Sequence, residues 1–230
     1  MEGPPQMTGK ETILGRVREA LRMPAVRKPA PSSAAHKPHE AREWLPAVGD
    51  TFAAQLELFQ KNAEALKARF ISCASLSEAL DCLAGLAAGW KSVGMHRASL
   101  LEPFATRLQD AGVRILYTDG GYAMDDLEAT DAGVTTCECL VAQTGSVLVT
   151  SASSGGRALS VLPPHHVVLA RREQLLPDLT AVFELTHARF GSNFPSMLSF
   201  ITGPSRTGDI ERILVLGAHG PKELTILLLP

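Results

Sequence analysis

The stretch RFISCASLSEALDCLAGLAAGWKSVGM, residues 69–95, contains one unit of the pattern from which the fold is predicted. The short apolar run RFISCA is followed by Ser75 and, three residues later, by Glu78, which is the signature of a helix start. The helix predicted from there reaches about Trp90, and KSVGM at 91–95 is a second short buried strand. A strand, a helix and a strand of these lengths are typical of parallel strands joined by a covering helix.

The same alternation continues on both sides of this unit. Upstream, Asp50 or Thr51 can cap a helix that runs to about Ala68. Downstream, residues 99–110 are predicted to be a helix and VRILY at 113–117 another strand. We therefore predict an α/β domain in which a mainly parallel sheet is sandwiched by helices.

The second half of the chain is richer in strands. Three β-rich runs between residues 137 and 171 are separated by small polar breaks, and a helix is predicted from about Glu173 to Phe190. The runs MLSFITG, RILVLGA and LTILLL follow, and the last two are predicted to form a hairpin across HGPKE. The predicted α/β domain therefore covers residues 46–230.

Residues 1–45 differ from this domain in composition. Residues 8–22 suit a helix with an apolar stripe, and the segment after it contains four prolines between positions 24 and 38. This segment is either an extended arm that lets the helix dock or a frayed terminus. We expect limited proteolysis to cut first between residues 24 and 45 and to leave a stable fragment from about residue 46. Strong protection of the segment would contradict this expectation.

Overall composition excludes several classes of protein. The net charge of −2, from 22 basic and 24 acidic residues, gives no electrostatic attraction for nucleic acid or an anionic membrane. No apolar run approaches the roughly 20 residues of a membrane span, and the N-terminus lacks the apolar core of a secretory signal. We expect a cytoplasmic protein.

The four cysteines, Cys73, Cys82, Cys137 and Cys139, do not suggest a metal or cluster site. No pair has the Cys-x-x-Cys spacing of common zinc or iron–sulfur sites. Two buried apolar thiols at 137 and 139 are the favoured interpretation. We expect no metal and no cofactor in this chain.

Two stretches contain polar residues suited to binding a small anion. In QTGSVLVTSASSGGR, residues 143–157, hydroxyls flank one glycine and an arginine follows a glycine pair. In GPSRTGDIE, residues 203–211, a Ser-Arg-Thr trio follows an apolar strand. The candidate anion-binding residues are Thr144, Gly145, Ser146, Gly155, Gly156, Arg157, Ser205, Arg206, Thr207 and His219.

Each candidate stretch also has a structural explanation. SSGG at 153–156 suits a hairpin turn with a solvated Arg157, and Arg206 can form a salt bridge with Asp209 or Glu211. The adjacent His165 and His166 face opposite ways if they lie on a strand, so a metal site is rejected there. Our hypothesis is one shared pocket at one end of the sheet that contains both arginines, with His219 near its rim.

The sequences QTGSVLVTSASSGGRALSVLPPHHVVL and FITGPSRTGDIERILVLGAHGPKELTILLL resemble the LUD-domain family, named for lactate utilisation, and within it the lactate utilisation protein C branch. The resemblance covers roughly residues 45–230. It implies a fold similar to the ribose-phosphate isomerase and CoA-transferase architecture. It also implies a role in oxidising L-lactate to pyruvate beside iron–sulfur partner proteins, which would hold the redox centres. No catalytic residue is carried over.

One position departs from the family pattern. Members usually have Ala-Glu-Thr-Gly or Ala-Glu-Ser-Gly where this chain has Ala142-Gln143-Thr144-Gly145. Gln143 cannot act as a carboxylate nucleophile, and Glu138 is the nearest other carboxylate. Two functions stay open: a subunit of a lactate-oxidising assembly that binds a small carboxylate or docks its partner, and a non-catalytic protein that binds a small anion. An isomerase or hydrolase of phosphorylated molecules is a weaker third.

The resemblance and the cysteine spacing together give a simple expectation for the isolated chain. Because the redox centres are expected on partners, the purified protein should be colourless and should not oxidise L-lactate alone. Absorption spectroscopy and a lactate oxidation assay would check this, and bound flavin, iron or turnover of lactate would contradict it.

Overall fold

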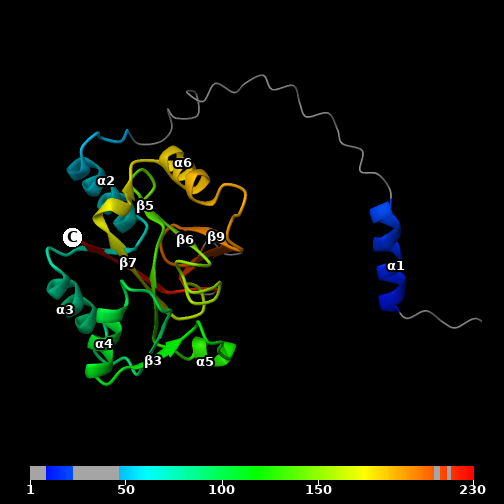
Figure 1. Ribbon diagram of the computed structural model, residues 1–230, viewed down its shortest axis with the longest axis horizontal. Coiled ribbons are helices and arrows are strands. Elements are labelled where there is room, and N and C mark those ends of the chain that lie inside the picture. The colour runs from blue at the N-terminus through cyan, green and yellow to red at the C-terminus, as the bar shows by residue number, and fades with distance from the viewer. Residues whose placement is uncertain (1–8, 23–46, 210–212, 217–218) are drawn as a thin grey trace, which may run out of the picture. The chain divides into compact units, whose positions relative to one another are not determined.

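The computed structural model describes residues 9–22, 47–209, 213–216 and 219–230, with the backbone alone at 207–209 and 213–216 (Figure 1). The chain separates into two units, Met1–Leu45 and Pro46–Pro230. In the first unit, helix α1 (Gly9–Arg22) exposes its apolar stripe of Ile13, Leu14, Val17 and Leu21. The predicted linker at 24–45 lies outside the described residues.

A six-stranded parallel sheet forms the centre of the second unit. Its order is β1 (Arg69–Ser72), β12 (Glu223–Leu229), β7 (His165–Arg171), β4 (Ala132–Thr136), β2 (Ser92–Met95) and β3 (Arg114–Tyr117). The central strands β7 and β12 are buried along almost their whole length, as strands covered on both faces of a parallel sheet require.

Helices α3 (Leu76–Leu86) and α4 (Glu102–Asp110) cover one face of this sheet. Their buried side chains, among them Leu83 and Phe104, form a single core with inward residues of β2, β4, β7 and β12. Helix α2 (Phe52–Ala65) packs on the opposite face through Phe59 and Ala63. The prediction of an α/β domain with a mainly parallel central sheet flanked by helices is confirmed.

A second, four-stranded sheet shares the opposite face with α2. Its order is β8 (Leu175–Leu176), β5 (Cys139–Val141), β6 (Ser146–Thr150) and β9 (Leu198–Ile201), and β6 is antiparallel to both of its neighbours. Helix α6 (Leu179–Phe190) packs on its outer face through Val182. Strands β5, β6 and β9 lie in the predicted β-rich runs, whereas β8 lies in the segment predicted to be a helix, and a separate sheet was not predicted.

Local helix signals were correct where a polar cap begins the helix. The Thr51 hydroxyl accepts a hydrogen bond from the Ala54 amide at 3.2 Å, and the Ser75 hydroxyl accepts one from the Glu78 amide at 3.1 Å. The helix predicted from Glu173 begins only at Leu179, because Asp178 caps it and residues 172–178 form a short 3-10 turn, η1 (Arg172–Gln174), and β8. The short helix α5 (Met124–Glu128) follows β3.

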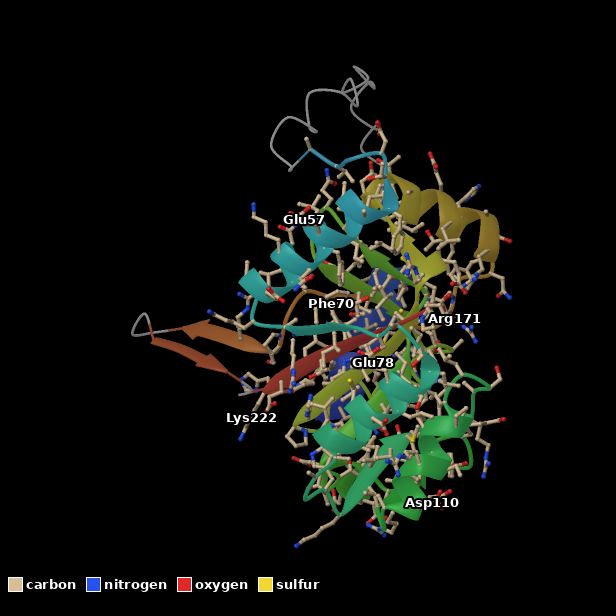
Figure 2. All side chains as sticks on the ribbon, turned by 90° about the vertical axis from the view of Figure 1, so that its left-hand side faces the viewer. Glu57, Phe70, Glu78, Asp110, Arg171 and Lys222 are labelled. Atoms are coloured by element: carbon tan, nitrogen blue, oxygen red, sulfur yellow. The ribbon has the colours of Figure 1, made fainter. Side chains whose placement is uncertain are left out.

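The predicted C-terminal hairpin is wrong. RILVLGA contributes β11 (Ile213–Leu216), which pairs antiparallel with β10 (Arg206–Asp209), and Figure 2 shows this hairpin beside Lys222, extending away from the sheet. LTILLL instead becomes β12, parallel to both β1 and β7. Its run of apolar residues is fully buried between those two strands, which a hairpin at the surface would not allow.

The interpretation of 137 and 139 as buried thiols is confirmed, since Cys137 and Cys139 are 4% and 0% exposed. Burial, followed by the charge of Glu138, raises the pKa of Cys139 to about 12. Burial likewise raises the pKa of Cys73 to about 12 and that of Cys137 well above its usual range. Cys82 is half-buried.

These environments predict selective thiol labelling. Because the thiolate is the nucleophile, iodoacetamide at pH 8 should alkylate Cys82 first and leave Cys73, Cys137 and Cys139 largely unmodified until the protein is unfolded. Mass spectrometry of tryptic peptides, with and without denaturant, measures this. Labelling of Cys137 in the native protein as fast as Cys82 would contradict the buried environment.

Within the described ranges, no helix is long and apolar enough to cross a lipid bilayer.

Candidate functional site

A pocket of about 260 Å³ lies where the amino ends of β7 and β12 meet the loop after β9. We call it the inner pocket. It lies at the amino ends of parallel strands, whereas open α/β sheets more often bind ligands at the carboxyl ends. It is lined by Ser160, Val161, His166, Phe200, Ile201, Thr202, Gly203, Pro204, Ser205, His219, Gly220, Pro221 and Leu224.

The inner pocket has a buried end and an exposed mouth. His166, Leu224 and Ser160 are 1%, 2% and 5% exposed and form the buried end. Thr202 and His219 are exposed and form the mouth. Since a ligand in this pocket would be desolvated progressively from mouth to buried end, any charged group of the ligand is most stable at the mouth.

His166 is the polar side chain that marks the buried end. It occupies the second position of β7, and its Nε2 lies 2.9 Å from the Thr135 hydroxyl of the neighbouring strand β4. Its Nδ1 is buried and has no hydrogen-bond partner among the described residues. Burial, assisted by the neighbouring His165, lowers the pKa of His166 to about 3, so the ring is neutral near pH 7.

The side chain of His165 lies in a different environment from that of His166. Neighbours on a strand face opposite ways, and His165 Nε2 lies 2.8 Å from the Thr225 hydroxyl of β12 while its ring packs edge-on against Trp90. Burial lowers the pKa of His165 as well. Among the described residues, no group of three or more His, Cys, Asp or Glu side chains is placed to hold a metal ion.

Several of the predicted site residues meet around Thr202. Ser205 and His219 line the inner pocket directly. The Ser146 hydroxyl lies 2.9 Å from the Thr202 hydroxyl, and the Arg206 guanidinium donates to the Thr202 carbonyl at 3.2 Å. The exposed Arg206 side chain therefore lies beside the mouth.

The second predicted arginine is elsewhere. Arg157 donates to the Ser196 carbonyl, just before β9. Because β6 and β9 are antiparallel, Ser196 lies near the Thr150 end of β6, whereas Thr202 lies near the Ser146 end. The two ends are about five residues, or roughly 13 Å, apart along β6. The prediction that both arginines share one pocket is therefore wrong.

The glycine pair is also remote from the inner pocket. Gly155 lies against His96, and its carbonyl accepts a hydrogen bond from the Thr118 hydroxyl at 2.9 Å, at the carboxyl ends of β2 and β3. Gly156 follows in the same loop, and its amide donates to the Ser151 carbonyl. This turn supports the sheet end. The Thr207 side chain and those of Asp209 and Glu211 lie outside the described residues.

The turn containing Thr144 and Gly145 is closed by internal hydrogen bonds. The amides of Gln143, Thr144 and Gly145 donate to carbonyls of Pro177 and Val141, so they are not oriented toward an anion. The Asn62 side chain of α2 donates to the carbonyls of Ala142 and Gln143 at 3.0 and 2.9 Å. These contacts give the turn a structural role at the position where the family pattern has glutamate.

Four polar residues of this site were not among the predicted site residues: Thr135, Ser160, His166 and Thr202. Thr202 stood directly before the small polar break at 203–208, which was the signal that could have identified it. Thr135 had no local signal, because its role depends on the pairing of β4 with β7. Glu138, the other carboxylate considered, is engaged by Thr150 and Arg189 and does not line the inner pocket.

Two bacterial proteins named lactate utilization protein C are similar in sequence to part of this chain. Lactate utilization protein C of Halalkalibacterium halodurans is 35% identical over 107 residues, 46% of each chain, and that of Bacillus subtilis is 32% identical over 103 residues, 44% of this chain and 43% of that one. The matched segments therefore span less than half the length of these curated relatives.

A solved structure and a family profile extend the comparison to most of the chain. The crystal structure of a DUF162 family protein from Deinococcus radiodurans superposes with a TM-score of 0.65 at 22% identity, covering 79% of this chain and all of that one, and so supports the fold. The LUD domain profile matches residues 56–229, which include both sheets and every residue that lines the inner pocket. The chain belongs to the LUD domain family.

Proposed function

We propose that this chain is a component of an L-lactate utilisation system, acting with iron–sulfur partner proteins in the oxidation of L-lactate to pyruvate. The relatives named lactate utilization protein C supply the biological context. The observation that carries the chain's own part is the inner pocket, whose size of about 260 Å³ suits a small organic acid. In this proposal the pocket binds the hydroxy or keto acid and the partners accept the electrons.

The polarity of the pocket supports one orientation of such a ligand. Arg206 and the exposed His219 lie at the mouth, where a carboxylate keeps contact with water and gains a charge-assisted hydrogen bond. The walls toward the buried end are apolar and include Ile201 and Leu224, which suit a methyl group. The ligand would therefore enter with its carboxylate outward.

A second candidate function is favoured by one observation. Gln143 occupies the position of the family glutamate and lies in a turn closed by hydrogen bonds to α2 and Pro177. If the family glutamate is a nucleophile, this chain lacks that step and is a non-catalytic protein that binds a small anion.

Genetic deletion tests the lactate assignment and separates the two candidates. In the organism that encodes the chain, deletion of its gene should abolish growth on L-lactate and leave growth on pyruvate unchanged, and a plasmid copy should restore it. Unchanged growth of the deletion strain on L-lactate would overturn the proposal. A strain carrying Gln143→Ala that grows as well as wild type would show that the side chain at this position performs no chemical step.

The arginine at the mouth gives a matched test of carboxylate binding. Arg206→Ala should weaken binding of L-lactate roughly tenfold, which is the lower end of the 1.5–3 kcal/mol of a charge-assisted hydrogen bond because the side chain is exposed. Arg157→Ala is the control, since Arg157 is also exposed and also donates to a carbonyl, but at the other end of β6. Calorimetric titration of both variants measures the two affinities. Equal losses would exclude Arg206 as the carboxylate contact.

A further inference from the structure

We infer that His166 Nδ1 is the recognition atom at the buried end of the inner pocket, and that it binds the uncharged oxygen next to the carboxylate of a 2-hydroxy or 2-keto acid. This inference rests on the proposed function, because it names the chemical class that the proposed site takes.

His166 contains a buried polar atom whose hydrogen bond is not satisfied within the described chain. His166 is 1% exposed, and its Nδ1 has no partner among the described residues. Buried polar atoms in folded proteins almost always have a partner, and leaving one unpaired costs free energy. Because His166 lines a pocket large enough for a small acid, a bound ligand can supply that missing partner.

The uncharged His166 ring is unsuited to binding a carboxylate. The pKa of His166, lowered by burial to about 3, leaves the ring uncharged near pH 7, and among the described residues no lysine or arginine lines the inner pocket. A carboxylate placed beside this ring would lose its hydration without gaining an opposite charge. A hydroxyl or carbonyl oxygen pays a much smaller desolvation penalty and gains a hydrogen bond.

The Thr135 hydroxyl lies 2.9 Å from His166 Nε2 and can determine which ring nitrogen carries the proton. A hydroxyl can donate or accept, so the neutral ring has two arrangements of equal charge. When Thr135 donates to Nε2, Nδ1 carries the proton and can donate to a ligand carbonyl. When Nε2 donates to Thr135, Nδ1 is bare and can accept from a ligand hydroxyl.

This pair therefore matches both members of a hydroxy acid and keto acid couple. The hydroxy acid offers a hydroxyl donor to bare Nδ1, and the keto acid offers a carbonyl acceptor to protonated Nδ1. Thr135 is 0% exposed and acts as a positioning residue, since it fixes the ring and completes either tautomer without touching the ligand.

The binding test compares three probes with the same carboxylate: L-lactate, pyruvate and propionate, which has no oxygen on the second carbon. The full-length protein should bind L-lactate and pyruvate at least about tenfold more tightly than propionate, because propionate leaves Nδ1 unpaired. His166→Phe should bind all three equally. Equal binding of the three probes by the unaltered protein would overturn the inference.

A second measurement remains decisive if His166→Phe fails to fold. Nitrogen-15 NMR of the unaltered protein should show His166 Nδ1 protonated when saturated with pyruvate, because a carbonyl oxygen can only accept a hydrogen bond. Thr135→Val should reduce the discrimination against propionate, and Thr135→Ser, which keeps the hydroxyl, should restore it. An unprotonated Nδ1 in the pyruvate complex would overturn the inference.

Failure of this inference is distinguishable from failure of the proposed function. If deletion of the gene abolishes growth on L-lactate but the probes do not discriminate, the lactate role stands and His166 is not the recognition group. If growth is unaffected but the three probes discriminate through His166, the site binds this class of acid and the assignment to lactate utilisation is wrong.

Discussion

Gly145→Ala is expected to destabilise the protein by about 4 kcal/mol or more, because the added methyl group meets the backbone of a helix. Gly145 has φ of +65°, and a Cβ at this position would lie 2.5 Å from the Ala63 amide nitrogen and 2.7 Å from the Asn62 carbonyl carbon. Neither atom can move alone, since both belong to α2 and Asn62 is bonded to the same turn. The change would therefore separate α2 from the second sheet.

Gly112→Ala is the matched control for this prediction. Gly112 has φ of +80° but no atom within 4 Å of an added Cβ, so alanine there adds only backbone strain, about 1 kcal/mol. Urea denaturation of both variants gives the two changes in the free energy of unfolding. If Gly145→Ala costs no more than Gly112→Ala, the close packing of the turn on α2 is incorrect.

The second large effect is expected from Arg189→Ala, which should lower the free energy of unfolding by roughly 2–3 kcal/mol. The Glu138 side chain is only 8% exposed, forms an ion pair with Arg189 and accepts a hydrogen bond from the Thr150 hydroxyl at 2.6 Å. Removal of the arginine leaves a buried carboxylate without its cation. The expected loss is below the roughly 3–5 kcal/mol of a fully buried pair because the Arg189 side chain is 52% exposed.

Two further variants make this prediction specific. The double variant Glu138→Gln and Arg189→Ala should recover at least half of the loss, since glutamine removes the charge and keeps an acceptor for Thr150. Arg107→Ala breaks a pair with Asp81 whose side chains are 48% and 67% exposed, and it should cost less than about 1 kcal/mol. Thermal and urea unfolding measure all three. An equal cost for Arg107→Ala and Arg189→Ala would exclude a special role for burial at Glu138.

The candidate site illustrates how far polar motifs can be interpreted without a structure. Ser205, Arg206 and His219 were predicted from their position in small polar breaks, and the structure places them at or beside one pocket. Arg157 was selected by the same criterion but contacts Ser196 at the opposite end of β6. Residue type alone selected candidates at both ends of β6. The antiparallel register of β6 and β9 shows that these candidates lie at opposite ends.

His166 shows the complementary error. The adjacent His165 and His166 were considered for a metal site, which was rejected, and nothing in the sequence distinguishes one histidine from the other. The difference between them arises from strand pairing: β12 supplies Thr225 to His165, and β4 supplies Thr135 to His166. The unpaired Nδ1 becomes visible only when all nearby donors and acceptors have been placed.

Features that depend on neighbouring residues could be predicted from the amino-acid sequence. The caps at Thr51 and Ser75, the alternation of short apolar strands with amphipathic helices, and the parallel character of the central sheet all follow from local propensity and periodicity. The motifs in the second half also carried the family resemblance, which the profile match over 56–229 confirmed.

The contacts between distant segments could be recognised only in the folded protein. The insertion of β12 between β1 and β7, and the contact of Ser146 with Thr202 across 56 positions, bring together residues that no local pattern connects. The reason is that these contacts are fixed by strand register and by the burial of whole faces, which are properties of pairs of elements. The inner pocket exists because the ends of β7, β9 and β12 converge, so its chemistry could be named from the sequence only in fragments.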